Sequence, residues 1–379
     1  MTTIQKFLID NKNLEFELIK AKLLNLNLTV KELDNLFIIN YNSKPEADNV
    51  NKELIKDCRS IIIDKNNYNI IMLGLTGSVK YNEFKELVNW NDAVIEESID
   101  GTLINLYYYN DMWNFSTKKT INGNCYWNTE KNFKELFLET IKKYNFNFNI
   151  LNQKYCYSFV LCHPEARNIT FYDKSKLYHV STRNLETFDE IDEDIGILKP
   201  NVLKINEYNI LNDNCNDYDK LLENLNNLEY SNEGYMLFSK DRKFRTKLRS
   251  KNHLIIKELK GSYSNMTLRI LELRTENNKF NIFMDLFPEY IELIKNIEKN
   301  IDLLAKNIFN YYIKTKINKE YVDIPQILKK PIYEIHKIYI NNKNNIKYNK
   351  LENNINLIKI IKWLNNLDAK YLCYLLNNC

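Results

Sequence analysis

Groups of charged and small polar residues interrupt the apolar runs in the first two thirds of this sequence. The most distinctive is segment 96–102, Glu-Glu-Ser-Ile-Asp-Gly-Thr, in which an acidic residue and a glycine open a predicted strand. The other groups, in chain order, are Arg59, Lys118 with Lys119, Glu233 with Gly234, and Lys247 with Arg249. Guanidinium and ammonium groups match the charge of phosphates, and carboxylates hold metal ions. These residue types can therefore bind phosphate groups and metal ions.

Each group taken alone also has a purely structural interpretation. An Asp-Gly pair at a strand start is most often a turn, and a turn also explains Glu233 beside its glycine. Arg59 is equally typical of a strand edge. Lys247 and Arg249 are two residues apart and share one face of a strand, which a solvated surface also explains. Structural roles are the simpler interpretation of the remaining candidates, His163, His336, Cys156 and Cys162.

The pattern of apolar residues predicts the elements that position these groups. Residues 1–35 have a helical pattern, and short apolar runs dominate from 36 to 125. Residues 103–109 and 112–117, joined by Asn-Asp, predict a β-hairpin. Further strands are expected at 36–39, 61–63, 70–73, 157–161, 177–181 and 235–239, and a helix at 133–144.

The pattern changes after about residue 255. Apolar residues from Ile291 to Tyr311 recur every three or four positions, which predicts one long helix. Further helices are expected around 332–340 and 357–376, with a loop at 341–345. The sequence therefore predicts a mixed α+β domain at 1–255 and an all-helical domain at 256–379.

Composition excludes several classes of protein. The 379 residues are 44% apolar, which predicts a globular protein and excludes wholesale disorder. No apolar stretch approaches the length of a membrane span, and no signal peptide is evident, so we expect a soluble cytoplasmic protein with no membrane partner. Seven scattered cysteines without a Cys-x-x-Cys pair, and only four histidines, argue against a disulfide framework and a zinc module.

Charge and asparagine content add two weaker indications. Residues 261–379 carry 18 basic and 12 acidic residues, a net charge of +6, which leaves −2 for the rest of the chain. A phosphate site in the first domain must therefore depend on a few placed cations. Sixty asparagines against 7 glycines and 6 prolines indicate an AT-rich genome.

In this order and spacing the groups resemble the motifs of the covalent nucleotidyltransferases, most closely the phage-type RNA ligase 1 family. The resemblance spans residues 36–260. It implies a nucleotidyltransferase (ATP-grasp-like ligase) domain of antiparallel sheets with flanking helices, followed by the helical domain. Segments 157–165 and 287–289 are also similar to ligase-like proteins of large DNA viruses, which agrees with the asparagine content.

The resemblance implies a role for each group. Family members use ATP and Mg²⁺ to adenylate a lysine that lies two residues before an Asp-Gly pair, here Asp100 and Gly101. Glu233 matches a family glutamate and is a candidate Mg²⁺ ligand or ribose contact. The residues expected to bind the nucleotide are Arg59, Gly101, Lys118, Lys119, Glu233, Lys247 and Arg249.

The sequence departs from the family at two positions. Ser98 occupies the place of the nucleophilic lysine, and no lysine lies between Asn91 and Tyr109. Val160 aligns with the glutamate of the family's Phe-Glu-Leu motif. A serine has no nitrogen and cannot form a phosphoramidate, and an ester through Ser98 needs a general base that the neighbouring sequence does not supply.

Three functions follow from the resemblance. The first is an ATP-dependent RNA ligase that joins or repairs RNA ends. The second is a pseudoenzyme that binds RNA or nucleotide in a viral context without self-adenylation. The third, a capping-type guanylyltransferase, needs the same lysine and fails at Ser98. We favour the RNA ligase family, with catalysis that lacks the usual covalent step or with no catalysis at all.

Overall fold

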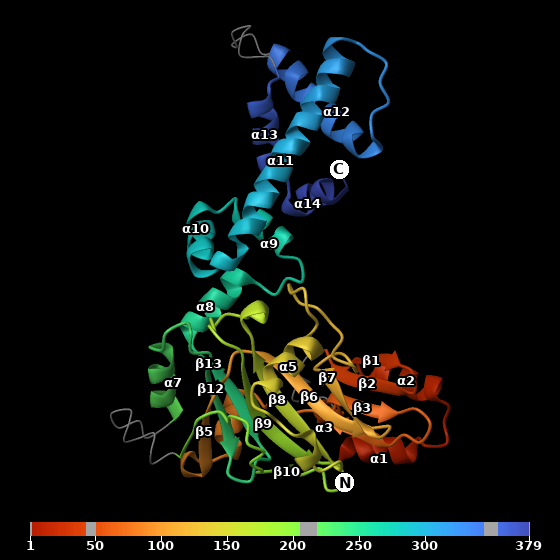
Figure 1. Cartoon of the computed structure of the whole chain (residues 1–379), viewed down its shortest axis with the longest axis vertical. Helices are drawn as coiled ribbons and strands as arrows, with labels where there is room; N and C mark the ends of the chain where they lie inside the picture. Colours follow the sequence, from red (N-terminus) through yellow and green to blue (C-terminus); the bar gives the residue numbers. More distant parts are fainter. Residues whose placement is uncertain (1, 43–50, 205–217, 345–354, 379) are drawn as a thin grey trace. The chain divides into compact units, whose positions relative to one another are not determined.

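The chain folds into two compact units, Met1–Lys257 and Glu258–Cys379. The computed structural model describes residues 2–42, 51–204, 218–344 and 355–378 (Figure 1). Over these residues all strands lie in the first unit, and the regular elements of the second unit are helical. The expectation of an α+β fold with a helical C-terminal part is therefore confirmed.

Three antiparallel sheets build the first unit. The N-terminal sheet has the order β1-β2-β3-β4, with strands Leu28–Leu33, Leu36–Tyr41, Arg59–Asp64 and Ile70–Leu73. The five-stranded sheet has the order β10-β9-β8-β6-β7, with strands Glu190–Ile191, Lys176–Asn184, Tyr155–Cys162, Thr102–Tyr109 and Met112–Thr117. The third sheet has the order β11-β5-β12-β13, with strands Val202–Lys204, Ala93–Glu97, Gly234–Ser239 and Arg245–Arg249.

Helices of this unit cover the sheets. They are α1 Thr3–Asp10, α2 Phe16–Asn25, α3 Lys52–Asp57, α4 Tyr81–Leu87, α5 Phe133–Lys142, α7 Tyr218–Asn226 and α8 Lys251–Lys260, which continues into the second unit. Capping boxes begin two of them: Thr2 with Gln5 at α1, and Asn132 with Glu135 at α5. Each box satisfies backbone N–H groups that have no partner inside the helix.

Alternation along the strands gives the N-terminal sheet two buried faces. Residues 37, 39, 61 and 63 pack in one cluster with residues of α1 and α2, and Figure 1 shows α2 beside β1 and β2. Residues 36, 38, 62 and 72 pack instead against Tyr107 and Cys156 of the five-stranded sheet. The continuous apolar runs that predicted these strands therefore arise because both faces are covered.

The third sheet is apolar on one face only. Ile95, Leu237 and Leu248 pack against α4 and α7. The intervening residues of β5, β12 and β13 face the opposite way and include Glu96, Met236 and Lys247. This second face carries the candidates Lys247 and Arg249, so the alternation of one sheet creates a polar surface inside the fold.

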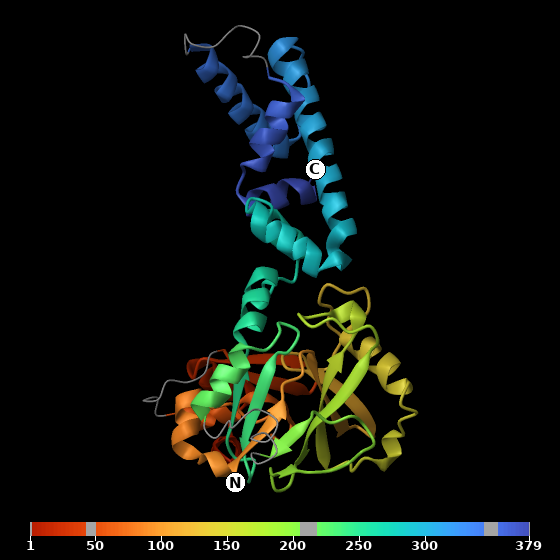
Figure 2. The same ribbon diagram turned by 90° about the vertical axis from the view of Figure 1, so that its left-hand side faces the viewer.

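The second unit is built around α11 (Ile291–Tyr312), the long helix of this unit in Figure 2. Its buried residues run from Ile294 to Tyr312. Its other helices are α9 Met266–Leu273, α10 Asn277–Leu286, α12 Gln326–Asn344, α13 Leu357–Asn365 and α14 Ala369–Asn378. Among the described residues, no helix has the length and apolarity to cross a bilayer.

Most predicted elements are confirmed, and two predictions are wrong. Residues 28–33 form β1, whereas the sequence pattern predicted helix up to residue 35. Antiparallel pairing with β2 supplies backbone hydrogen bonds that local propensity does not anticipate. Residues 341–344 continue α12 in place of the expected loop, and residue 345 lies outside the described residues.

Candidate functional site

The carboxylate of Glu233 is the centre of the polar face of the third sheet. It lies just before β12 and is buried. Its Oε2 accepts hydrogen bonds from Ser98 Oγ at 2.9 Å and from Lys247 Nζ at 2.6 Å. Its Oε1 accepts one from Arg249 Nε at 2.9 Å. Three of the predicted site residues therefore converge on a fourth.

The sheet register explains this convergence. Strand β12 lies between β5 and β13, so that Met236 pairs with Glu96 on one side and Lys247 on the other. At the start of β12, the backbone N–H of Ser98 donates to the carbonyl of Gly234 at 2.9 Å, and Gly234 pairs with Arg249. Residues more than 130 positions apart thus become neighbours on one face.

Charge pairing decides the ionisation of this cluster. Burial raises the pKa of Glu233, but Lys247, Arg249 and the Ser98 hydroxyl outweigh burial and hold that pKa below its ordinary value. Burial lowers the pKa of Lys247, while the charge of Glu233 opposes the shift. The carboxylate is therefore a stable anion at neutral pH, and its basicity is reduced.

A cavity of about 170 Å³ lies beside this cluster. Its lining combines residues of all three sheets with the loops between them. Ser98, Gly101, Met236 and Lys247 are among the lining residues, as is Val160 at the position of the missing family glutamate. The cavity therefore brings together several candidates that lie far apart in the sequence, from Arg59 to Lys247, together with apolar surface.

Two arginines of the cavity have no acidic partner among the residues that the structure describes. Arg59 and Arg245 both donate to the backbone carbonyl of Thr76, and the Nε of each is buried without a hydrogen bond. Among the described residues, no ion pair joins either guanidinium to a carboxylate. Burial and the neighbouring Arg59 lower the pKa of Arg245 to about 9. An anion entering the cavity would relieve this mutual repulsion.

Arg245 is a residue that the sequence analysis missed. It lies two residues before Lys247 on β13, in the alternating series Arg245, Lys247 and Arg249. The same alternation that placed the last two on one face would have included it. Its location next to Arg59 depends on long-range pairing that the sequence pattern does not reveal.

Asp100 and Gly101 have mainly conformational roles in the structure. Oδ2 of Asp100 accepts backbone N–H bonds from Ile169 and Thr170, both at 2.8 Å. A Cβ on Gly101 would lie 2.6 Å from the carbonyl oxygen of Leu161 and from Cγ1 of Val160. Only glycine permits this close approach of two strands.

Lys118 and Lys119 are not among the described residues that line the cavity. They follow the end of β7 in a bend and are not part of a strand. Lys118 is half-buried with its Nζ 5.6 Å from the ring centre of Tyr41. Burial, then Arg59 and Lys119, lower its pKa, which shows that it adds positive charge near Arg59.

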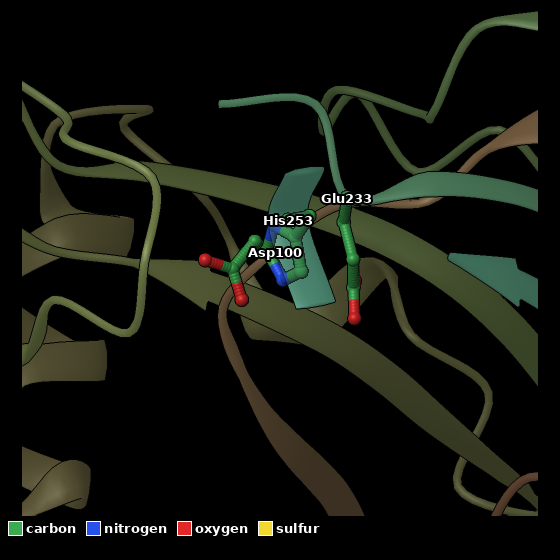
Figure 3. Close-up of side chains that lie close together, drawn as sticks. All are labelled: Asp100, Glu233 and His253. Carbon is green, nitrogen blue, oxygen red and sulfur yellow. The ribbon is translucent and has the colours of Figure 1, made fainter. Parts of the chain in front are cut away.

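His253 is the second residue that the sequence analysis missed. It lies on α8, is fully buried, and approaches two predicted site residues. One potential ligand atom from each of Asp100, Glu233 and His253 lies within 4.8 Å of the others. Figure 3 shows the imidazole ring between the two acidic side chains. No local motif marks His253, because its neighbours in the sequence are ordinary helix residues.

The other histidine and cysteine candidates have structural environments. Nδ1 of His163 accepts the backbone N–H of Glu165 and caps the short helix Pro164–Ala166. His336 is half-buried beside Tyr312. Cys156 and Cys162 are buried thiols. These placements agree with their structural interpretation.

Sequence comparison relates the chain to RNA ligases. It is 25% identical over 281 residues to a protein named bifunctional polynucleotide kinase/RNA ligase from Autographa californica nuclear polyhedrosis virus. It is 33% identical over 100 residues to an RNA ligase of Rhodothermus phage RM378. Over these segments the chain is similar to RNA ligases of a virus and a phage. No family model matches it.

The extent of these similarities differs among the relatives. The alignments cover 69% and 24% of this chain, but only 39% of the baculovirus protein and 23% of the phage protein. An archaeal ATP-dependent RNA ligase of known structure is 12% identical, with a TM-score of 0.44 over 76% of this chain and 83% of its own.

The pairing of Glu233 predicts a pH-dependent contribution to stability. Because its pKa in the folded chain lies below the ordinary value of 4.5, the pairing stabilises the fold above pH 4.5 and is lost as the pH falls through the lower folded value. Glu233→Gln should reduce the free energy of unfolding by about 1–3 kcal/mol at pH 7. Urea unfolding should show that this difference shrinks at acidic pH.

Glu53→Gln is a suitable control because the Glu53 side chain is 65% exposed. It should change the free energy of unfolding by less than about 0.5 kcal/mol. A wild-type minus Glu233→Gln difference that stays constant from pH 7 to acid would contradict the pairing argument.

Proposed function

We propose that this chain binds ATP and RNA in the cavity of its first unit and acts on RNA ends without adenylating Ser98. The single observation that carries the proposal is the convergence of Ser98, Glu233 and Lys247 beside a cavity with unpaired arginines. The names of the viral and phage relatives support RNA as the second ligand. We assign residues 1–255 to the RNA ligase-like domain and 256–379 to a helical domain.

Placed cations support a triphosphate as the ligand. Arg59, Arg245 and Lys247 contribute to the cavity, and the first two have no carboxylate partner among the described residues. A guanidinium group binds phosphate oxygens in pairs, and desolvation inside a cavity strengthens that attraction. Lys118 lies close enough to Arg59 to add to the positive electrostatic potential at the cavity. We propose Lys119, which is exposed, only as a contact at the outer edge of the site.

The environment of Ser98 supports the absence of a covalent step. Its hydroxyl donates to Glu233, which is therefore a candidate general base that the sequence did not reveal. However, Lys247 and Arg249 compete for the same carboxylate and keep its pKa low, so that it is a poor acceptor for a serine proton. The hydroxyl is also short, whereas the family nucleophile is an amine at the end of a long side chain.

A divalent ion is part of the proposed site. Glu233 is the carboxylate that the resemblance assigns to Mg²⁺, and Asp100 lies within reach of the same space. A metal ion would neutralise charge on the phosphates of the nucleotide. The residues of this chain would orient the triphosphate, exclude water on the apolar side of the cavity, and hold Asp100 in place through its backbone contacts.

The alternative function is a catalytically degenerate pseudoenzyme that binds RNA or nucleotide. Val160 and Ser98 both line the cavity where the family has a carboxylate and a lysine, which favours this alternative. RNA carrying a 5′-adenylate separates the two functions, because it bypasses the missing lysine. Strand joining from such RNA supports an active ligase, and no joining supports the pseudoenzyme.

The wild-type chain should form no covalent AMP adduct. After incubation with α-labelled ATP and Mg²⁺, a denaturing gel should show no labelled protein, whereas Ser98→Lys should acquire a labelled band. The reason is that only the variant has an amine at the nucleophile position. Ser98→Met, with a long side chain but no amine, is the matched control and should stay unlabelled. A labelled wild-type band would sink the proposal.

Lys247 should contribute directly to nucleotide affinity. Lys247→Met keeps much of the side-chain stem and removes the charge, so the Kd for ATP should rise roughly tenfold or more. Calorimetric titration measures this change. The control is Lys243→Met, since that side chain is 74% exposed and lies on the turn before β13. Equal Kd values for wild type and Lys247→Met would remove Lys247 from the site.

RNA binding should weaken steeply as salt is added. Lysine and arginine contacts to phosphates release counterions, so the logarithm of the association constant should fall linearly with the logarithm of the KCl concentration. Fluorescence anisotropy with a labelled single-stranded RNA measures the slope. A flat response would argue against RNA as a partner.

A further inference from the structure

His253 presents a buried ring nitrogen that has no hydrogen-bond partner among the described residues. Its Nδ1 lies 3.0 Å from the backbone carbonyl oxygen of Tyr230. Because a carbonyl oxygen only accepts hydrogen bonds, Nδ1 carries a proton, and in the neutral ring Nε2 carries the lone pair. Nε2 is buried and makes no hydrogen bond. A buried acceptor without a partner is costly unless another group satisfies it.

The two nearest carboxylates suit a metal ion at this place. Asp100, Glu233 and His253 are all buried and offer ligand atoms within 4.8 Å of one another. In Figure 3 the ring of His253 lies between the two acidic side chains. An imidazole fixed through its other nitrogen to a carbonyl is the usual arrangement of a metal-ligating histidine. The unsatisfied Nε2 of His253 and the two neighbouring carboxylates are independent observations, and both indicate a bound metal ion.

We propose that Asp100, Glu233 and His253 form a protein-ligated site for a divalent transition-metal ion, which prefers Mn²⁺ or Zn²⁺ to Mg²⁺. The preference follows from the imidazole, since Mg²⁺ favours oxygen ligands whereas transition-metal ions also accept nitrogen. This inference deepens the proposed function, because it assigns the metal to ligands of the chain. It differs from the expected Mg²⁺ site on Glu233 in its ligands and in its metal.

Lys247 and Arg249 limit the affinity of this site. Both cations already bond to the oxygens of Glu233, so an incoming metal ion competes with Lys247 for Oε2. Asp100 carries no such cationic partner among the described residues, and its Oδ2 is held by two backbone N–H groups. Removing the charge of Lys247 should therefore tighten metal binding, although the same change weakens nucleotide binding.

The experiment is a titration of the full chain with MnCl₂ in the absence of nucleotide and RNA. Electron paramagnetic resonance measures free Mn²⁺, and MgCl₂ is added as the competitor. We expect one Mn²⁺ per chain and a Kd for Mg²⁺ at least tenfold higher. Asp100→Asn, whose amide oxygen still accepts the two backbone bonds, should raise the Mn²⁺ Kd at least tenfold. His253→Gln should do the same and abolish the preference over Mg²⁺.

His179→Gln is the matched control, because His179 is also buried and has an unsatisfied ring nitrogen but lies outside the cluster. It should leave Mn²⁺ affinity unchanged, whereas Lys247→Met should increase it. The proposal is overturned if wild type binds no Mn²⁺, if Mg²⁺ binds equally well, or if Asp100→Asn and Lys247→Met both leave the affinity unchanged. Asp100→Asn keeps the test valid should His253→Gln fail to fold.

Failure of the metal site and failure of the proposed function give different results. Mn²⁺ binding without ATP binding leaves the metal site standing and removes the nucleotide function. If the chain binds ATP but binds no Mn²⁺ in the absence of nucleotide, the nucleotide function stands and the metal site is removed.

Discussion

One buried carboxylate, Glu233, organises the polar interior of the first unit. Its hydrogen bonds tie the end of β5, the start of β12 and the face of β13 into one cluster through Ser98, Lys247 and Arg249. An unpaired buried charge would be strongly destabilising, so the anion and its two cations depend on one another. The third sheet can therefore carry a charged face inside the protein, and the cavity beside it acquires its electrostatic character from this arrangement.

The remaining positive charge of the cavity comes from a few residues and not from the overall composition. Residues 1–260 have a net charge of −2, yet Arg59 and Arg245 meet at the carbonyl of Thr76 without a carboxylate partner in the described part of the chain. The fold thus concentrates cations where its average charge is slightly negative. Burial makes each of these charges more effective toward a phosphate than a surface lysine would be.

Local patterns in the sequence predicted what depends on near neighbours. Continuous apolar runs identified β2, β3 and β4 because both faces of their sheet are buried, and the spacing of Lys247 and Arg249 placed them on one face. The pairing of β5 with β12, which creates the Glu233 cluster, joins residues far apart and leaves no local signal. His253 was missed for the same reason, because it matters only through its closeness to Asp100 and Glu233. Asp100 lies more than a hundred residues away in the sequence, and Glu233 lies about twenty residues away.

The salt bridge between Glu233 and Lys247 would couple the binding of an anion to the binding of a cation. Oε2 of Glu233 accepts hydrogen bonds from both Lys247 and Ser98. A ligand that binds Lys247 would remove the lysine from Glu233 and leave the carboxylate available. A ligand that binds Glu233 would in the same way leave Lys247 available. An anion is drawn to the first and a cation to the second. If the proposed anion and metal ion bind here, thermodynamic reciprocity requires each to raise the affinity for the other by the same factor. A single short salt bridge would thereby make binding cooperative without any movement of the sheets.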